Sequence, residues 1–208
     1  MTRPSNVLGM ILAGGLARRM GGGDKSLIEL NGKPLLAHVI DRLKSQTDHL
    51  ILNANGEAAR FAEYHLPVVP DPIDGAQGPL AGVLAGLDWA QANTPQCDWM
   101  VSVASDTPFF PEDLIDKMMA AVGASGADMA CAASNAREHP VFGLWPVKLA
   151  GDLRIALIDE NIRKVDVWTG RYKCEVVDFE AETFDPFFNV NRPEDIEQAR
   201  MIAQRVLS

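Results

Sequence analysis

The chain reads VLGMILAGGLARRMGGGDK from Val7 to Lys25, an apolar run that passes directly into a glycine-rich, basic segment. The run Val7–Leu12 is short and stops at Gly14-Gly15, which is typical of a buried strand. Glycines let backbone N–H groups approach a ligand closely. The same segment adds the cations Arg18, Arg19 and Lys25. Convergent N–H groups and cations after a first strand predict a site for a polyphosphate.

Apolar runs alternate with helical patterns from this strand onward. Strands are expected at 7–12, 49–52, 68–69 and 99–104, and helices at 34–46, 57–65, 80–91 and 111–122. This alternation predicts an α/β fold of Rossmann-like, three-layer α/β/α type with a mostly parallel sheet. Ligands bind beyond the carboxyl ends of such strands. The loops at Gly14, Asn53, Asp71 and Asp106 are therefore expected to meet.

The pattern changes after residue 126. Strands are expected at 129–133, 141–145 and 173–179, a helix at 147–159 and a closing helix at 193–206. No segment between the halves is rich in Pro, Gly or Ser. We therefore predict one domain over residues 1–208, in which 1–126 binds the phosphate ligand and 127–208 extends the same sheet over part of the site.

Composition limits the partners. The 208 residues are 47% hydrophobic with a formal net charge of −9, which disfavours binding to nucleic acid because that needs Lys and Arg. No apolar run approaches the roughly 18–20 residues that span a bilayer, and no signal peptide is visible, so we expect no membrane contact and a cytoplasmic protein. The three widely spaced cysteines indicate neither a disulfide framework nor a zinc site.

The glycine-rich loop fits neither of two well-known phosphate motifs. A P-loop needs Gly immediately before Lys-Ser, but Asp24 precedes Lys25-Ser26. The dinucleotide fingerprint needs glycines at its first, third and sixth positions, whereas Gly14 and Gly15 are adjacent. The loop therefore predicts phosphate binding of another kind.

The residues of the loop do resemble a known pattern, which continues along almost the whole chain. Its parts are Leu12-Ala-Gly-Gly15, Arg19-Met-Gly21, Asp24-Lys25, Leu30-Asn-Gly-Lys-Pro34, Asn53, Pro70-Asp71, Gly78-Pro-Leu-Ala-Gly82, Asp106-Thr-Pro108, His139-Pro140 and Asn189-Val-Asn-Arg-Pro-Glu-Asp195. Together they resemble the nucleotidyltransferase superfamily, and within it the molybdenum cofactor guanylyltransferases, also called molybdopterin-guanine dinucleotide synthases. The resemblance implies a nucleotidyltransferase fold whose second half, 127–208, binds the pterin.

The resemblance also implies a reaction and its residues. GMP passes from GTP to the terminal phosphate of molybdopterin or molybdenum cofactor, pyrophosphate leaves, and Mg²⁺ is the cofactor. The implied catalytic residues are Arg19, Lys25 and Asp106, with Asp106 as the metal ligand. The implied GTP-binding residues are Leu12, Ala13, Gly14, Gly15, Lys25, Asn53, Asp71, Gly78, Leu80 and Asp106. The implied pterin-binding residues are His139, Asn189 and Asn191, and the last two share one face of an extended segment.

Other functions stay open at this point. A cytidylyltransferase or a sugar-phosphate nucleotidyltransferase has the same fold, because fold does not fix substrate. A non-catalytic carrier of nucleotide or pterin is the second alternative, although binding alone does not need a metal carboxylate together with loop cations. By analogy with the family, molybdoenzyme apoproteins or their chaperones are further expected partners.

Overall fold

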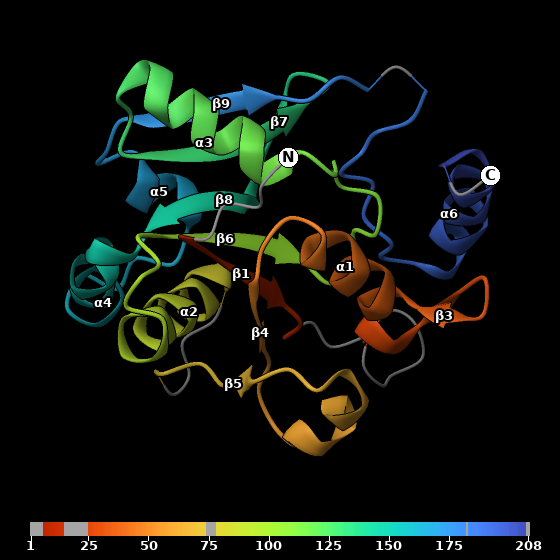
Figure 1. The fold of residues 1–208 in the computed structure, drawn as a ribbon, viewed down its shortest axis with the longest axis horizontal. Helices are drawn as coiled ribbons and strands as arrows, with labels where there is room; N and C mark the ends of the chain where they lie inside the picture. Colours follow the sequence, from red (N-terminus) through yellow and green to blue (C-terminus); the bar gives the residue numbers. More distant parts are fainter. Residues whose placement is uncertain (1–5, 15–24, 74–77, 182, 207–208) are drawn as a thin grey trace.

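The computed structural model describes residues 6–14, 25–73, 78–181 and 183–206. Its main feature is a seven-stranded sheet in the order β5-β4-β1-β6-β8-β7-β9, which Figure 1 shows from β5 at the bottom to β9 at the top. The strands are β1 (Val7–Leu12), β4 (His49–Asn53), β5 (Val68–Val69), β6 (Trp99–Ala104), β7 (Met129–Ser134), β8 (Arg137–Pro146) and β9 (Cys174–Asp178). Only β8 runs antiparallel to its neighbours β6 and β7. The predicted mostly parallel α/β sheet is confirmed.

Helices cover both faces of this sheet. They are α1 (Leu35–Lys44), α2 (Pro79–Asn93), α3 (Leu114–Ser125), α4 (Ala150–Ile158), α5 (Val165–Thr169) and α6 (Pro193–Val206), with the 3₁₀ turns η1 (Lys25–Leu27), η2 (Ala58–Tyr64) and η3 (Val147–Leu149). Within the residues described, none of them has the length and apolar character that a membrane crossing requires.

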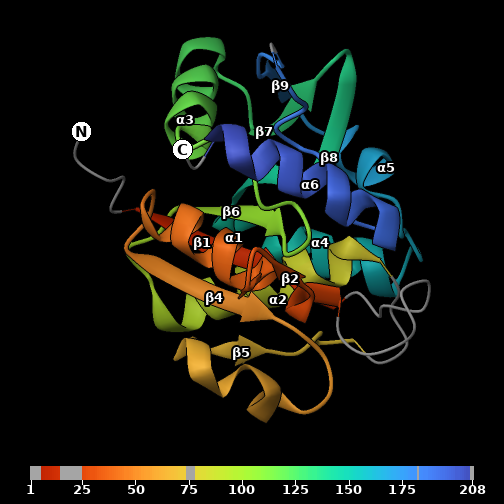
Figure 2. The same ribbon diagram turned by 90° about the vertical axis from the view of Figure 1, so that its right-hand side faces the viewer.

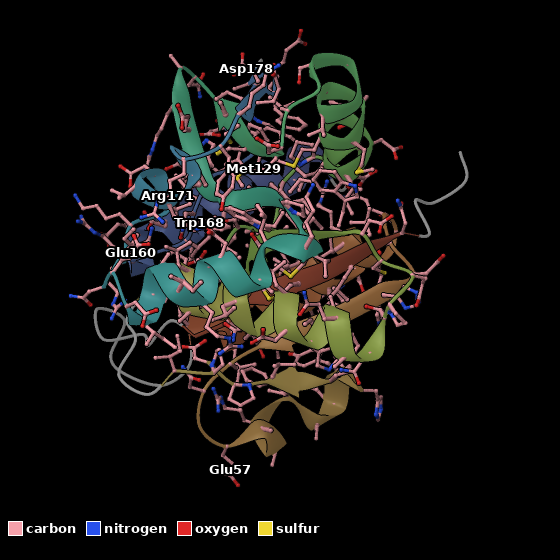
Figure 3. The ribbon with its side chains drawn as sticks, turned by 90° about the vertical axis from the view of Figure 1, so that its left-hand side faces the viewer. Glu57, Met129, Glu160, Trp168, Arg171 and Asp178 are labelled. Carbon is pink, nitrogen blue, oxygen red and sulfur yellow. The ribbon has the colours of Figure 1, made fainter. Side chains whose placement is uncertain are left out.

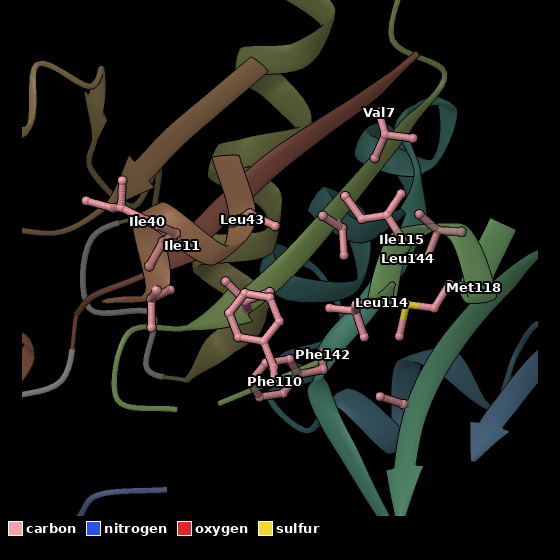
Figure 4. Packing of buried hydrophobic residues seen from close by; sticks show 14 of the residues in the cluster. Val7, Ile11, Ile40, Leu43, Phe110, Leu114, Ile115, Met118, Phe142 and Leu144 are labelled. Atoms are coloured by element: carbon pink, nitrogen blue, oxygen red, sulfur yellow. The ribbon is translucent and has the colours of Figure 1, made fainter. Parts of the chain in front are cut away.

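Two apolar clusters fill the space between sheet and helices. Strand β1 feeds both because side chains alternate along a strand. Val7 and Ile11 pack with α1 and α3, while Leu8 and Met10 pack with α2 and α4. In the first cluster the ring centroids of Phe110 and Phe142 lie 6.0 Å apart. Figure 4 shows these two rings next to each other. The sheet is therefore buried on both sides, as parallel sheets require.

The second cluster contains two tryptophans, a residue type that can stack on an aromatic ligand when its ring face is accessible. Trp145 and Trp168 are both fully buried, with ring centroids 5.9 Å apart. Figure 3 shows Trp168 and Met129 inside the molecule, and Glu57 and Asp178 at its opposite ends. The two tryptophans are therefore core residues.

A third apolar cluster attaches the C-terminal helix. The hairpin of β2 (Glu29–Leu30) and β3 (Lys33–Pro34) contributes Leu30, which packs with Ile202 of α6 and with Val190 before it. Figure 2 shows α6 beside the hairpin and α1. The N–H of Val190 donates to the carbonyl of Asp106 at 2.9 Å. These contacts bring the segment before α6 to the carboxyl end of β6.

Several boundaries differ from the sequence expectation. Helix α3 begins at Leu114 instead of residue 111, and Gly126 with φ 63° ends it, so Gly123 lies inside the helix. The expected helix 147–159 divides into η3 and α4, and β8 begins four residues early, at Arg137. The β2–β3 hairpin and α5 were not expected. The two strands of the hairpin have two residues each and α5 has five, which is too few to show a periodic pattern.

Candidate functional site

The sheet reverses its strand order between β1 and β6. The chain adds β4 and β5 on one side of β1 and then places β6 on the other side. The gap beyond the carboxyl ends of two such strands is where α/β sheets bind ligands. A cavity of about 480 Å³ lies there. Its walls are Leu12, Gly14, Lys25, Asn53, Asn55, Asp71, Gly78, Pro79, Gly82, Ala104, Ser105, Asp106, Val141 and Asn189.

Most residues expected to bind the nucleotide line this cavity, namely Leu12, Gly14, Lys25, Asn53, Asp71, Gly78 and Asp106. Ala13 and Leu80 are buried beside it and are not part of its walls. The N–H of Ala13 already donates to the carbonyl of Asn53 at 2.9 Å. Gly15 and Arg19 lie outside the described residues.

Asp71 is held by amide side chains at the end of β5. Asn53 Nδ2 donates to one carboxylate oxygen at 3.0 Å, and Asn55 Nδ2 donates to the other at 2.7 Å. Asn55 Oδ1 also accepts the N–H of Asp71 at 2.8 Å. The carboxylate is thus fixed and keeps free lone pairs for N–H or O–H donors of a ligand. Asn55 was missed by the sequence analysis, although it lies two residues after Asn53.

In the same cavity, three side-chain oxygens surround the ammonium group of Lys25. Its Nζ contacts Asp106 Oδ2 and Asn191 Oδ1, and lies 3.2 Å from Asn189 Oδ1. The side chains of Lys25 and Asp106 are 12% and 17% exposed. Three separate segments supply these groups: η1, the turn after β6 and the irregular segment before α6. Asn189 and Asn191 point to the same side, and Val190 between them is buried.

The oxygens around Lys25 fit a hard divalent cation. One carboxylate and two amide oxygens converge on a single positive charge, and these are ligand types that Mg²⁺ accepts. In the part of the chain that the structure describes, no group of three or more His, Cys, Asp or Glu side chains could hold a metal ion. One carboxylate with amide oxygens is a donor set that Mg²⁺ can use when phosphates and water supply its other ligands.

A second cavity, of about 380 Å³, adjoins the first. The two share Ala104, Val141 and Asn189 in their walls. The second is further lined by Thr107, Arg137, Glu138, His139, Pro140, Phe142, Asp185, Phe187, Phe188 and Asn191. It contains all three residues expected to bind a pterin. Burial lowers the pKa of His139, which favours the neutral imidazole. Arg137 and Asp185 had no motif that the sequence analysis could have used.

A larger cavity of about 540 Å³ lies elsewhere, beside the first residue of β6. Its walls include Gln91, Cys97, Trp99 and Lys148, and none of the expected site residues. It is at the amino end of β6, whereas ligands of parallel sheets bind at the carboxyl ends. We therefore place the functional site at the two adjoining cavities.

Comparison with known proteins identifies the family. The model of the MobA-like NTP transferase domain matches residues 9–171. The molybdenum cofactor guanylyltransferase of Rhodopseudomonas palustris (strain BisB5) is 56% identical over 94% of this chain and 93% of its own length. That of Bradyrhizobium sp. (strain ORS 278) is 54% identical over 95% and 93%.

The fold has solved counterparts. The crystal structure of molybdopterin-guanine dinucleotide biosynthesis protein A from Archaeoglobus fulgidus superposes with a TM-score of 0.72. The match covers 95% of this chain and 98% of that one at 24% sequence identity. At that identity the likeness concerns the fold.

Proposed function

This chain belongs to the molybdenum cofactor guanylyltransferase family, and on that premise we propose that it transfers GMP from GTP to the terminal phosphate of molybdopterin, releasing pyrophosphate. The observation that carries the proposal is the meeting of two cavities beside Lys25 and Asp106. A transfer enzyme needs two substrates side by side. In this proposal the nucleotide takes the cavity at β1 and β6, and the pterin takes the one at His139.

The proposed step is a displacement at phosphorus. An oxygen of the acceptor phosphate forms a bond to the α-phosphorus of GTP, and the bond from that phosphorus to the β-phosphate oxygen breaks. Pyrophosphate leaves with the electron pair. A phosphate monoester is already anionic near pH 7, so the step needs no strong general base. Positioning and charge neutralisation supply most of the rate enhancement.

The cluster at Lys25 provides the charges for this step. Mg²⁺ held by Asp106, with the oxygen of Asn189 or Asn191, would neutralise charge on the phosphates. Lys25 would then bind phosphate oxygens as a point charge. Arg19 keeps its proposed role of stabilising charge in the transition state. What supports the proposal is the convergence of three oxygens on one ammonium.

We assign the guanine side of the cavity to Asp71 and its neighbours. Guanine presents N1–H and N2–H₂ as donors and O6 as an acceptor. The fixed Asp71 carboxylate is an acceptor suited to such donors, with Asn53 holding it in place. Leu12, Gly14, Gly15 and Gly78 are proposed to contribute backbone contacts, whereas Ala13 and Leu80 lie behind the cavity walls.

The setting of the reaction is part of the same proposal. All three cysteines are free, which suits the reducing cytoplasm. The guanine dinucleotide product would pass to molybdoenzyme apoproteins or their chaperones.

A nucleotide-selectivity assay tests this function. Purified protein is mixed with molybdopterin, Mg²⁺ and GTP, CTP or ATP in separate reactions, and pyrophosphate release is followed. We expect release with GTP, dependent on the pterin. A preference for CTP would indicate a cytidylyltransferase on the same fold. No release with any nucleotide, from folded protein and active pterin, would favour the non-catalytic carrier.

A further inference from the structure

His139 is connected to two side chains that the reaction described above does not use. Its Nε2 lies 2.8 Å from Ser134 Oγ, and Ser134 Oγ donates to Asp185 Oδ1 at 2.7 Å. The three residues come from β8, β7 and the segment before α6, respectively. Ser134 is completely buried, while His139 and Asp185 line the second cavity. The chain thus builds a polar connection beneath this cavity.

The order of the contacts differs from that of a hydrolase triad. In a triad the histidine stands between serine and aspartate and takes the serine proton. Here Ser134 stands between His139 and Asp185, and it has no exposed surface. Its proton is directed to the carboxylate, away from the histidine. Ser134 is therefore not an activated nucleophile.

The same contacts define which nitrogen of His139 carries the proton. Asp185 Oδ1 also accepts the N–H of Phe187 at 2.9 Å, so this oxygen acts as an acceptor. Ser134 has one proton and gives it to Asp185. The serine oxygen must then accept from His139, which places a proton on Nε2. In the neutral ring Nδ1 carries a lone pair, and among the described residues nothing is hydrogen-bonded to it.

The plane of the imidazole is fixed as well. The ring stacks on Phe187 with centroids 4.5 Å apart and an interplanar angle of 27°. Phe187 is itself buried and packs edge-on against Phe142 at 4.8 Å and Phe179 at 5.6 Å. Because Asp185 binds the backbone of Phe187, one carboxylate holds both the stacking partner and the serine.

The charge state of the ring follows from its surroundings. Burial lowers the pKa of His139; the nearby Arg137 lowers it further, and Asp185 opposes them. The ring is therefore neutral near pH 7.5, and its Nδ1 is available to accept a hydrogen bond. A pterin carries an amino group and a ring N–H, which are donors that such an acceptor can bind.

We infer that Ser134 and Asp185 are positioning residues that hold His139 as the neutral Nε2–H tautomer, so that Nδ1 accepts a hydrogen bond from an N–H donor of the pterin. This inference rests on the proposed function, because it assigns the pterin to this cavity. It makes the Ser134–Asp185 pair a determinant of acceptor binding and not of GTP binding.

Two measurements on the full-length protein test the inference. Long-range ¹H–¹⁵N spectra of the histidine rings at pH 7.5 report which nitrogen carries the proton. The chain has four histidines, so the signals lost in H139Q identify His139. Steady-state kinetics then give kcat and the KM values for GTP and for molybdopterin. The variants are S134A and D185A. Asp185 is only half-buried, so D185A still tests the inference if S134A does not fold.

S102A is the matched control. Ser102 is also completely buried in the sheet, where it donates to the carbonyl of Val141 and accepts from Trp145, and it lines neither cavity. Loss of its hydroxyl costs stability of the same kind as loss of the Ser134 hydroxyl. It should change neither the His139 spectrum nor the KM for molybdopterin.

We expect the Nε2–H tautomer in the wild type and a mixture of tautomers in S134A and D185A. The KM for molybdopterin should rise about tenfold, the effect of one hydrogen bond, with the KM for GTP nearly unchanged. A wild-type Nδ1–H tautomer or a cationic ring would overturn the inference, as would a changed tautomer with an unchanged KM for molybdopterin. A wild type that transfers no nucleotide refutes the proposed function instead, and the spectra still decide the tautomer.

Discussion

At the scale of single residues, Asp106 is the side chain on which the proposed chemistry depends most. It lies in the turn two residues after β6, contacts Lys25 and is the one carboxylate among the three oxygen-bearing side chains around that lysine. D106N keeps the shape and removes the charge. We expect kcat to fall by about 10²–10³, the loss typical of one strong electrostatic contact in a transition state. Steady-state assays with saturating GTP and Mg²⁺ measure it, and near-wild-type kcat would refute the metal assignment.

Replacing Lys25 should strengthen metal binding and weaken GTP binding, because its ammonium group contacts the oxygens that Mg²⁺ would use. K25M removes the charge and frees Asp106, Asn189 and Asn191. Binding of Mn²⁺ without nucleotide should therefore become tighter, while the KM for GTP rises about tenfold or more through loss of a phosphate contact. Electron paramagnetic resonance of free Mn²⁺ measures the first effect.

K33M is the control for that experiment. Lys33 also pairs with an aspartate, Asp41, but on the surface and away from both cavities. It should change neither Mn²⁺ binding nor the KM for GTP. Weaker or equal Mn²⁺ binding in K25M would contradict the view that lysine and metal compete for one set of oxygens.

At the scale of secondary-structure elements, the contact of α2 with β1 and β4 forms the floor of the nucleotide cavity. A Cβ on Gly82 would come within 2.4 Å of Asn53 Oδ1 and of Leu12 Cδ2. G82A should therefore move α2 or Asn53 and lower the free energy of unfolding by about 1–3 kcal/mol. Urea denaturation measures the stability, and the KM for GTP should rise because Asn53 holds Asp71.

Gly123 provides the matched comparison. It lies in α3, is exposed, and a Cβ there would meet nothing within 4 Å. G123A should leave the free energy of unfolding unchanged or raise it by about 0.4–1 kcal/mol. Alanine has a higher helix propensity than glycine, and it makes the unfolded chain less flexible. A G82A variant with the same free energy of unfolding as G123A would contradict the close packing of α2 on Asn53.

The same scale shows what the sequence can predict. Strands β1 and β6 have their predicted bounds because a continuous apolar run buried on both faces leaves a clear pattern. Helix α6 also has its predicted bounds, since Pro193 marks the beginning of the helix. The start of α3 was placed three residues early because Pro111 can also lie in a turn before a helix. The β2–β3 hairpin was missed because two-residue strands carry no period.

The site residues also divide into those that the sequence can predict and those that it cannot. Lys25, Asp71 and Asp106 could be expected at one cavity because each follows or flanks a predicted strand or belongs to a motif, whereas Asn189 was expected to bind the pterin and lines both cavities. Asn55, Ser134 and Asp185 could not, since their roles arise from contacts between distant segments. Hydrogen bonds across 51 residues, such as that between Ser134 and Asp185, leave no mark in local sequence.

At the scale of the whole molecule, a buried and a half-buried thiol in the sheet couple its stability to pH. Burial raises the pKa of Cys131 to about 12 and that of Cys174 to about 11. In the unfolded chain these thiols ionise near pH 8.5. Their contribution to stability is therefore complete below that pH and is lost as the pH rises toward 11 and 12. The urea midpoint should fall between pH 8 and pH 10, and a higher midpoint at pH 10 would contradict this account.

The arrangement of the sheet gives each half of the chain one cavity, with the Lys25 cluster at their boundary. The first half of the chain supplies most walls of the nucleotide cavity, β8 with the segment before α6 supplies most walls of the other, and Ala104, Val141 and Asn189 belong to both. The two substrates would thus approach from opposite halves of one continuous sheet. In the proposed function, the α-phosphate of GTP lies at this boundary and passes to the acceptor.

Transfer of isotope from labelled GTP tests that requirement most directly. The protein is incubated with molybdopterin, Mg²⁺ and GTP labelled with ³²P at either the α or the γ position, and the products are separated. Label from the α position should appear in the pterin dinucleotide, and label from the γ position should appear only in pyrophosphate. Label from the γ position in the pterin, or α label found only as free GMP, would contradict guanylyl transfer at this site.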